Sequence, residues 1–241
     1  MKNVLGIVAI AGLAASAMAR PEANLSIQFS TDDSVWSDNA IVAPGEDKVF
    51  VRVLMSIPDS FYGISGARYN VTSVAGDWDV GGNDGADLTA GKGSATDGRI
   101  AGFDFGGQTQ TIFETGNQLR VDAKGDNGNS ANAGISTSQN TPGALGTNFN
   151  TNKTAVVYKF AINLHAAHAA GDVITLKIMD GGANGSPDQI TSFKAYESAS
   201  STAGVQLTGE TGDTGTITFV PAPASLALVG LAGLTAGRRR R

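Results

Sequence analysis

The residues best suited to chemistry lie in one short acidic segment, residues 77–87. Its potential oxygen ligands are Asp77, Asp79, Asn83, Asp84 and Asp87. Clustered carboxylate and amide oxygens are the ligands that Ca²⁺ prefers in proteins. The segment departs from the EF-hand loop, because Gly81 stands at the fifth ligand position and Leu88 where the bidentate glutamate belongs. Calcium binding is therefore one hypothesis, and a flexible acidic loop without a metal is the default interpretation.

The two histidines of the chain, His165 and His168, lie three residues apart. On a helix this spacing would place both imidazoles on one face and offer two ligands to a transition metal. No third ligand is evident, and the segment separates two expected strands, so a solvated turn is the preferred interpretation. A Ser-His-Asp triad would have to use one of these histidines, and no G-x-S-x-G motif accompanies them. The sequence predicts no catalytic residue, and we expect a protein that is not an enzyme.

Aromatic side chains could form a platform on which sugar rings stack. The candidates are Trp36, Phe61, Tyr62, Tyr69, Trp78 and Tyr196. Aromatic residues make up only 7% of the chain, and most of them are better explained as core residues or cross-strand pairs. Trp78 differs because it adjoins the acidic segment. A carbohydrate-binding module that uses Trp78 and this segment, with or without calcium, is therefore the alternative function.

The elements that must position these residues belong to a globular, acidic chain. Hydrophobic residues make up 41% of its 241 residues and charged residues 16%, which excludes a highly charged disordered polymer and a multi-span membrane protein. The absence of cysteine excludes a disulfide scaffold, a zinc-thiolate site and a cysteine nucleophile. The net charge is −5, and the only positive run is Arg238 to Arg241. Nucleic acid is therefore not an expected partner, and no cofactor is expected other than the calcium considered above.

The central 200 or so residues predict a single all-β domain, an antiparallel β-sandwich. The clearest strand is Lys48–Ile57, where apolar residues alternate but neither face is wholly polar, which indicates a central strand covered on both sides. Segments 81–98 and 125–151 are rich in glycine and small polar residues and predict long surface loops. The other expected strands are Leu25–Phe29, Gly66–Val74, Ile100–Phe105, Gln118–Asp122, Ala155–Leu164, Val173–Met179, Ile190–Tyr196 and Thr216–Val220.

The N-terminus has the pattern of a secretory signal peptide. Lys2 precedes the apolar stretch Val4–Ala15, and the small residues Ala17 and Ala19 form an A-x-A cleavage pattern that places the cut before Arg20. A buried N-terminal helix is the alternative. We expect residues 1–19 to be removed and the protein to be exported.

The C-terminus combines a proline motif, an uncharged stretch and a basic end. Val220, Pro221 and Pro223 are followed by 14 uncharged residues, 224–237, and by Arg238, Arg239, Arg240 and Arg241. As a helix the uncharged stretch spans about 21 Å, less than the roughly 30 Å of a bilayer core, which favours transient membrane insertion over permanent anchoring. The arginines would stay on the cytoplasmic side and leave the rest of the chain outside.

This order of parts resembles the PEP-CTERM sorting signal, which an exosortase is thought to recognise and remove. Val220-Pro221-Ala222-Pro223 stands where the family has its V-P-E-P box, with Ala222 in the position usually held by glutamate, so cleavage of the tail stays open. The resemblance implies an exosortase-like processing enzyme as a partner and a link to exopolysaccharide or biofilm. A generic tail anchor, which would hold a precursor in the inner membrane, is the alternative.

The body itself has a weaker resemblance to cohesin-like modules, which are extracellular jelly-roll sandwiches. It rests on the segments 44–53 (PGEDKVFVRV), 63–69 (GISGARY), 158–162 (YKFAI) and 171–176 (GDVITL). The resemblance supports the fold, and no residue that would carry a dockerin interaction can be matched.

The sequence therefore predicts three parts: a signal peptide at 1–19, a β-sandwich at 20–219 and a sorting tail at 220–241. Removing both ends takes away five of the 17 basic residues and none of the 22 acidic ones, which leaves a net charge of −10. Such a charge favours solubility and association with divalent cations over binding to polyanions. The expected role is structural or adhesive, at the cell surface or in the extracellular matrix.

Overall fold

The computed structural model describes residues 22–43, 45–74, 76–78, 84–88, 98–103, 110–115, 118–123, 135–137, 139, 153–164, 168–180, 189–210 and 213–221. Within these ranges the fold is all-β, and no α-helix occurs. No helix there is both long and apolar enough to span a bilayer. The signal peptide with its cleavage residues Ala17, Ala19 and Arg20, and the tail from residue 222 onwards, lie outside the described residues.

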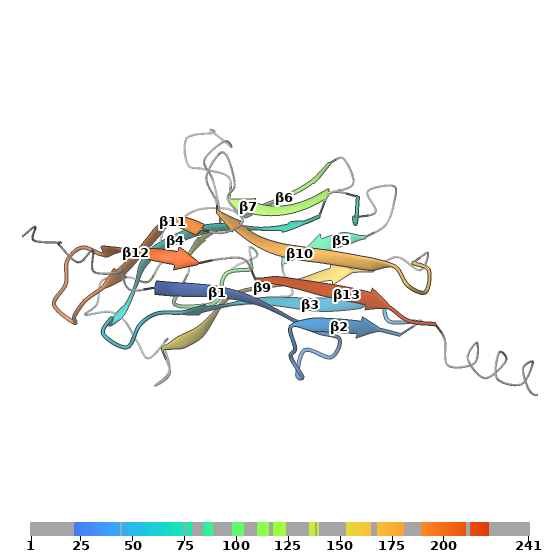
Figure 1. Ribbon diagram of the computed structural model, residues 1–241, viewed down its shortest axis with the longest axis horizontal. Coiled ribbons are helices and arrows are strands. Elements are labelled where there is room, and N and C mark those ends of the chain that lie inside the picture. The colour runs from blue at the N-terminus through green and yellow to red at the C-terminus, as the bar shows by residue number, and fades with distance from the viewer. Residues whose placement is uncertain are drawn as a thin grey trace, which may run out of the picture.

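The strands are β1 (Glu22–Ser30), β2 (Asn39–Val42), β3 (Lys48–Ser56), β4 (Gly63–Ser73), β5 (Gly85–Asp87), β6 (Gln110–Thr115), β7 (Gln118–Ala123), β8 (Ile135–Thr137), β9 (Thr154–Asn163), β10 (Val173–Asp180), β11 (Gln189–Tyr196), β12 (Val205–Glu210) and β13 (Thr214–Phe219). They pack as the two layers of a β-sandwich (Figure 1). Strands β1, β3, β9 and β5 are successive neighbours in one layer, and β2, β13, β10 and β4 in the other, with β11 and β12 completing the hydrogen-bonded path between β4 and β1. The predicted all-β sandwich is confirmed, whereas the flanking signal peptide and C-terminal helix lie outside the described residues.

The pairing is not antiparallel throughout. Strand β1 runs parallel to β12 through Glu22 to Asn24, and β13 runs parallel to β2 through Thr216 to Phe219. The other pairs are antiparallel, among the strands that the structure describes. Two parallel contacts therefore join the first two strands of the chain to its last two strands. The alternation pattern did not predict them.

Strand β3 lies at the centre of its layer, as predicted, between β1 and β9. Its inward side chains Val49, Val51, Val53 and Met55 are fully buried, and the burial of each apolar side chain of this size contributes roughly 1.5–3 kcal/mol. The side chains between them are only partly covered. The outer face of β3 is therefore a half-open surface instead of a second core.

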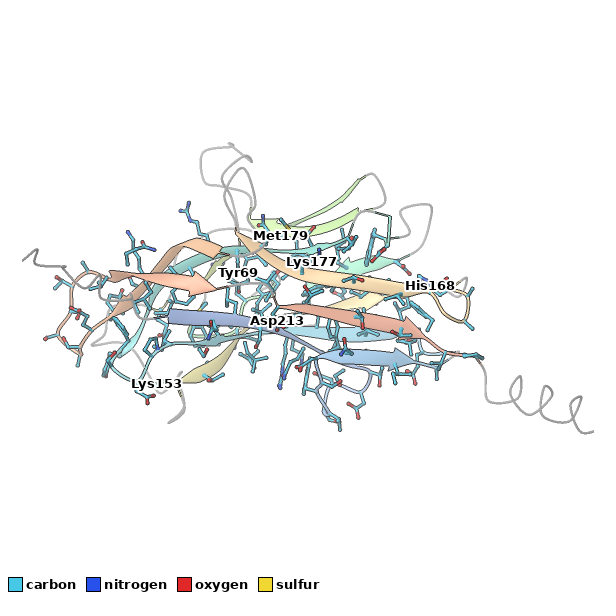
Figure 2. All side chains as sticks on the ribbon, viewed as in Figure 1. Tyr69, Lys153, His168, Lys177, Met179 and Asp213 are labelled. Atoms are coloured by element: carbon cyan, nitrogen blue, oxygen red, sulfur yellow. The ribbon has the colours of Figure 1, made fainter. Side chains whose placement is uncertain are left out.

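The two layers approach closely where Phe29 of β1 packs on Gly215 of β13. A Cβ atom at Gly215 would lie 2.1 Å from Cε2 of Phe29 and 2.5 Å from the carbonyl oxygen of Asp38, so only glycine fits without a shift. Asp213, just before β13, also links the layers (Figure 2). Its carboxylate accepts a hydrogen bond of 2.7 Å from the backbone N–H of Ile27.

One expected strand is wrong and several short strands were missed. Residues 100–103, which begin the expected strand Ile100–Phe105, form a turn closed by a hydrogen bond from the N–H of Phe103 to the carbonyl of Ile100. Strands β5 and β8 lie inside the segments 81–98 and 125–151 that were predicted as loops, and β2, β6 and β12 were also missed. Three-residue strands carry no periodicity of their own, because they form by pairing with the longer β9 and β4.

Candidate functional site

A compact group of side chains lies at the end of the sandwich where β13 finishes. His168, labelled in Figure 2, precedes β10, and its Nε2 atom lies 2.9 and 2.7 Å from the two carboxylate oxygens of Asp84. Because a carboxylate only accepts, Nε2 is the donor. The Asp84 side chain is fully buried and that of His168 is 11% exposed. The imidazole is therefore largely covered, unlike the predicted solvated turn, although residues 169–172 beside it are exposed.

The same histidine contacts the last residue of β13. The imidazole stacks on the ring of Phe219, with centroids 3.9 Å apart and an interplanar angle of 12°. The backbone of Phe219 donates to the carbonyl of Asp172 and accepts from the N–H of Gly171, and the N–H of Val220 donates to the carbonyl of Val42. The chain is thus held by side-chain and backbone contacts up to Val220.

The chemistry of this group is that of a partly buried polar contact. One ring nitrogen of His168 binds Asp84, and the other, Nδ1, lies 3.9 Å from a carboxylate oxygen of Asp172. Both nitrogens therefore face carboxylates, and among the described residues no serine or threonine hydroxyl bonds to the ring. The arrangement joins the turn before β10 to the segment that contains β5. His165 lies outside the described residues.

The acidic residues proposed for calcium point to different partners where they are described. Asp77 accepts a hydrogen bond from the N–H of Thr175, Asp84 contacts His168, and Asp87 lies 3.9 Å from the Nζ atom of Lys48. Asp79 and Asn83 lie outside the described residues. No group of three or more metal-ligating side chains occurs among the residues that the structure describes. Calcium binding stays a prediction, and it would need ligands from residues 79–83, which lie outside the described residues.

The alternative role of Trp78 in ligand contact is contradicted by its position. Its side chain is 1% exposed and belongs to the hydrophobic core. A buried indole offers no face to a sugar ring. Phe61, Tyr69 and Tyr196 are also buried, as the core interpretation of the aromatic residues predicts. The alternative function, in the form that relies on Trp78, is therefore not supported.

A different cluster covers the outer face of β3. It contains Trp36, which the sequence analysis named as an aromatic candidate, and basic partners that the sequence analysis did not predict. The guanidinium of Arg52 lies 4.3 Å from the ring centroid of Trp36. The Nζ atom of Lys159 lies 5.6 Å from the same ring and 5.5 Å from that of Phe50. Alternation along β3 places Arg52 outward, but no local signal shows that the loop carrying Trp36 folds back over it.

Of the sorting residues, the structure describes Val220 and Pro221 only. Val220 follows directly on β13, at the end of the sandwich where that strand finishes. Pro223, Arg238, Arg239, Arg240 and Arg241 lie outside the described residues.

No protein-family model and no curated protein matches the chain. Solved structures that resemble it include cohesin modules. The seventh ScaB type I cohesin from Pseudobacteroides cellulosolvens is 10% identical, with a TM-score of 0.42, and the match covers 85% of this chain and 95% of that one. The third cohesin of ScaC from Acetivibrio cellulolyticus is 9% identical, with a TM-score of 0.41 and coverage of 82% and 99%. The type III cohesin of the ScaE scaffoldin from Ruminococcus flavefaciens is 12% identical, with a TM-score of 0.38 and coverage of 86% and 91%. Similarity at this level carries no inference about partners or activity.

Proposed function

We propose that this chain is an exported, non-enzymatic protein of the cell surface or extracellular matrix with a structural or adhesive role. An exosortase-like enzyme processes it, and it associates with exopolysaccharide or biofilm material. Residues 1–19 act as the signal peptide, 20–219 as the β-sandwich and 220–241 as the sorting tail.

The position of the tail motif relative to the fold carries the proposal. The motif begins at Val220, one residue after β13 ends at Phe219. At the other end, cleavage before Arg20 would leave only two residues ahead of β1, which begins at Glu22. Both sorting segments therefore lie outside the described strands, and their removal would leave these strands complete.

The contacts at the end of β13 support this division. The backbone bonds of Phe219 and Val220, together with the His168 ring stacked on Phe219, hold the base of the tail to the sandwich. Residues 224–237 would then insert transiently in the membrane, with the arginines on the cytoplasmic side.

Intact-mass analysis of the protein from cells and medium of its native host tests the proposal. We expect a mass that lacks residues 1–19 and the segment after about Pro223. A variant with Arg238 to Arg241 replaced by glutamine should accumulate with its tail uncut. Lys194→Gln, which removes a single positive charge from the exposed surface of β11, should be processed normally. Recovery of a chain that keeps Arg238 to Arg241 in the membrane fraction would replace the proposal with a tail-anchored envelope protein.

A further inference from the structure

The cluster on the outer face of β3 is built by the sheet and by one loop. Gln28, Arg52 and Lys159 lie opposite one another on the neighbouring strands β1, β3 and β9. The loop of residues 31–38, which projects at the lower edge of Figure 1, joins β1 to β2 and brings Trp36 over this row. Trp36 remains partly exposed. The row and its aromatic cover therefore form a surface that solvent reaches.

The loop is held in a defined conformation. The carboxylate of Asp32 accepts hydrogen bonds of 2.9 Å from the backbone N–H groups of Ser34 and Val35, and Asp33 adopts a left-handed φ of 60°. The carboxylate of Asp33 lies 2.5 Å from the Nζ atom of Lys159. Trp36 is thus positioned before any ligand arrives.

The cations of this cluster are incompletely compensated. Arg52 and Lys159 are like charges opposite each other on neighbouring strands, an arrangement that destabilises a sheet. Lys159 has the carboxylate of Asp33, but Arg52 directs both Nε and Nη2 to one neutral oxygen, Oε1 of Gln28, at 3.0 and 2.6 Å. Among the described residues its Nη1 group makes no hydrogen bond. Burial lowers the pKa of Arg52, with the nearby Asp33 acting in the opposite direction, so an added anion would stabilise its charged form.

We propose that Trp36, Arg52 and Lys159 form a binding site for a sugar carboxylate, that is, for a uronate unit of an acidic polysaccharide. The carboxylate would bind Arg52 and Lys159, and an apolar face of the same pyranose ring would pack on the exposed part of Trp36. A uronate carries both features on one ring, whereas an inorganic anion would use only the cations.

The net charge of the chain restricts the class of polysaccharide. With a net charge of −5, or of −10 once both ends are removed, the protein repels a polymer that carries a negative charge on every unit. The site therefore suits a largely neutral chain with isolated uronates. This inference rests on the exopolysaccharide association proposed above and specifies the chemistry of that polymer.

The probe is a glucuronate-containing oligosaccharide, and its matched control is the same oligosaccharide with the carboxyl group reduced to the alcohol. Calorimetric titration of the purified full chain should show binding of the first and at least about tenfold weaker binding of the second. Arg52→Gln and Trp36→Ala should each weaken binding of the glucuronate probe by about tenfold or more. Lys177→Gln, which removes a cation from β10 in the other layer (Figure 2), should change it by less than about twofold.

Equal affinity for the two oligosaccharides would overturn the proposal, as would full binding by the Trp36→Ala protein. Single-stranded DNA that displaces the probe at a comparable concentration would show a general anion site instead. Thermal unfolding of each variant separates loss of the site from loss of the fold, and Arg52→Lys provides a second test that keeps the charge but loses the guanidinium fork. Because binding is measured on the purified chain, its failure is distinct from failure of tail processing in cells.

Discussion

The two tryptophans of the chain lie in similar sequences and have opposite roles. Trp36 stands in a loop with Asp32, Asp33 and Asp38, and Trp78 follows Asp77 at the start of the acidic segment. Trp78 is buried in the core, whereas Trp36 lies on the outer face of a layer over Arg52. Local composition therefore does not decide whether an aromatic residue of this chain can meet a ligand.

The difference follows from what each loop is tied to. Asp77 accepts a hydrogen bond of 3.1 Å from the N–H of Thr175 on β10, and its own N–H donates to the carbonyl of Val74, so this turn stays close to the end of β4 and its indole turns inward. The loop of Trp36 is tied to Lys159 on the solvent side of β9. The strand to which each loop is bonded therefore determines whether its tryptophan is buried or exposed.

Replacing the two tryptophans separately gives the largest expected contrast. Trp78→Ala should lower the free energy of unfolding by about 3–5 kcal/mol, because it leaves a cavity in the core. Trp36→Ala should lower it by only about 0.5–2 kcal/mol, the range for cation–π contacts. Urea denaturation followed by circular dichroism measures both. Equal losses would show that Trp36 is also a core residue.

Gly215→Ala should disturb the packing between β13 and the loop that carries Trp36. The new methyl group would collide with Phe29 and with the carbonyl of Asp38 in the Trp36 loop, at a cost of about 1–3 kcal/mol. Gly66→Ala is the matched control, since nothing lies within 4 Å of its Cβ position. Denaturation midpoints measure the effect, and similar midpoints for the two variants would contradict the close packing of the layers.

The charged pairs near the two loops should also differ in their contribution to the free energy of unfolding, with the more buried pair contributing more. Asp84→Ala removes the buried partner of His168 and should cost about 1–3 kcal/mol. Asp33→Asn weakens the more exposed pair with Lys159 and should cost at most about 1 kcal/mol. Thermal unfolding monitored by calorimetry compares them. If Asp33→Asn lowered the stability more than Asp84→Ala, the exposed Asp33–Lys159 pair would matter more than the Asp84–His168 pair, contrary to this prediction.

The smallest expected effect is a change in acid sensitivity of the Trp36 loop. Hydrogen bonds from the backbone N–H groups of Val35 and then Ser34 lower the pKa of Asp32 from 3.8 to well below its usual range. Its stabilisation of the loop is therefore complete above pH 3.8 and lost as pH falls through the lowered pKa. In a Trp78→Phe background, Trp36 emission should change below pH 3.8, and less so with Asp32→Asn. An identical titration in both proteins would refute a role for Asp32.

Long strands could be predicted from the sequence, because period-2 alternation is a local property of the chain. Strand β3 shows this most clearly, since its buried residues Val49, Val51, Val53 and Met55 are those that the pattern selects. The short strands β5 and β8 were not accessible, because they exist only through pairing with β9 and β4. The parallel contacts of β1 with β12 and of β13 with β2 join distant parts of the chain and leave no local pattern.

The sequence by itself determined the fold class, the acidic charge and the two terminal motifs, all of which depend on composition or on residues close together in the chain. Only the tertiary structure decided that His168 meets Asp84 across 84 positions, that Trp78 is buried and that Trp36 covers Arg52. Each of these outcomes depends on which strand lies beside a loop. Packing of the whole sandwich sets the strand register. The register therefore determines which aromatic side chains enter the core and which ones a ligand can reach.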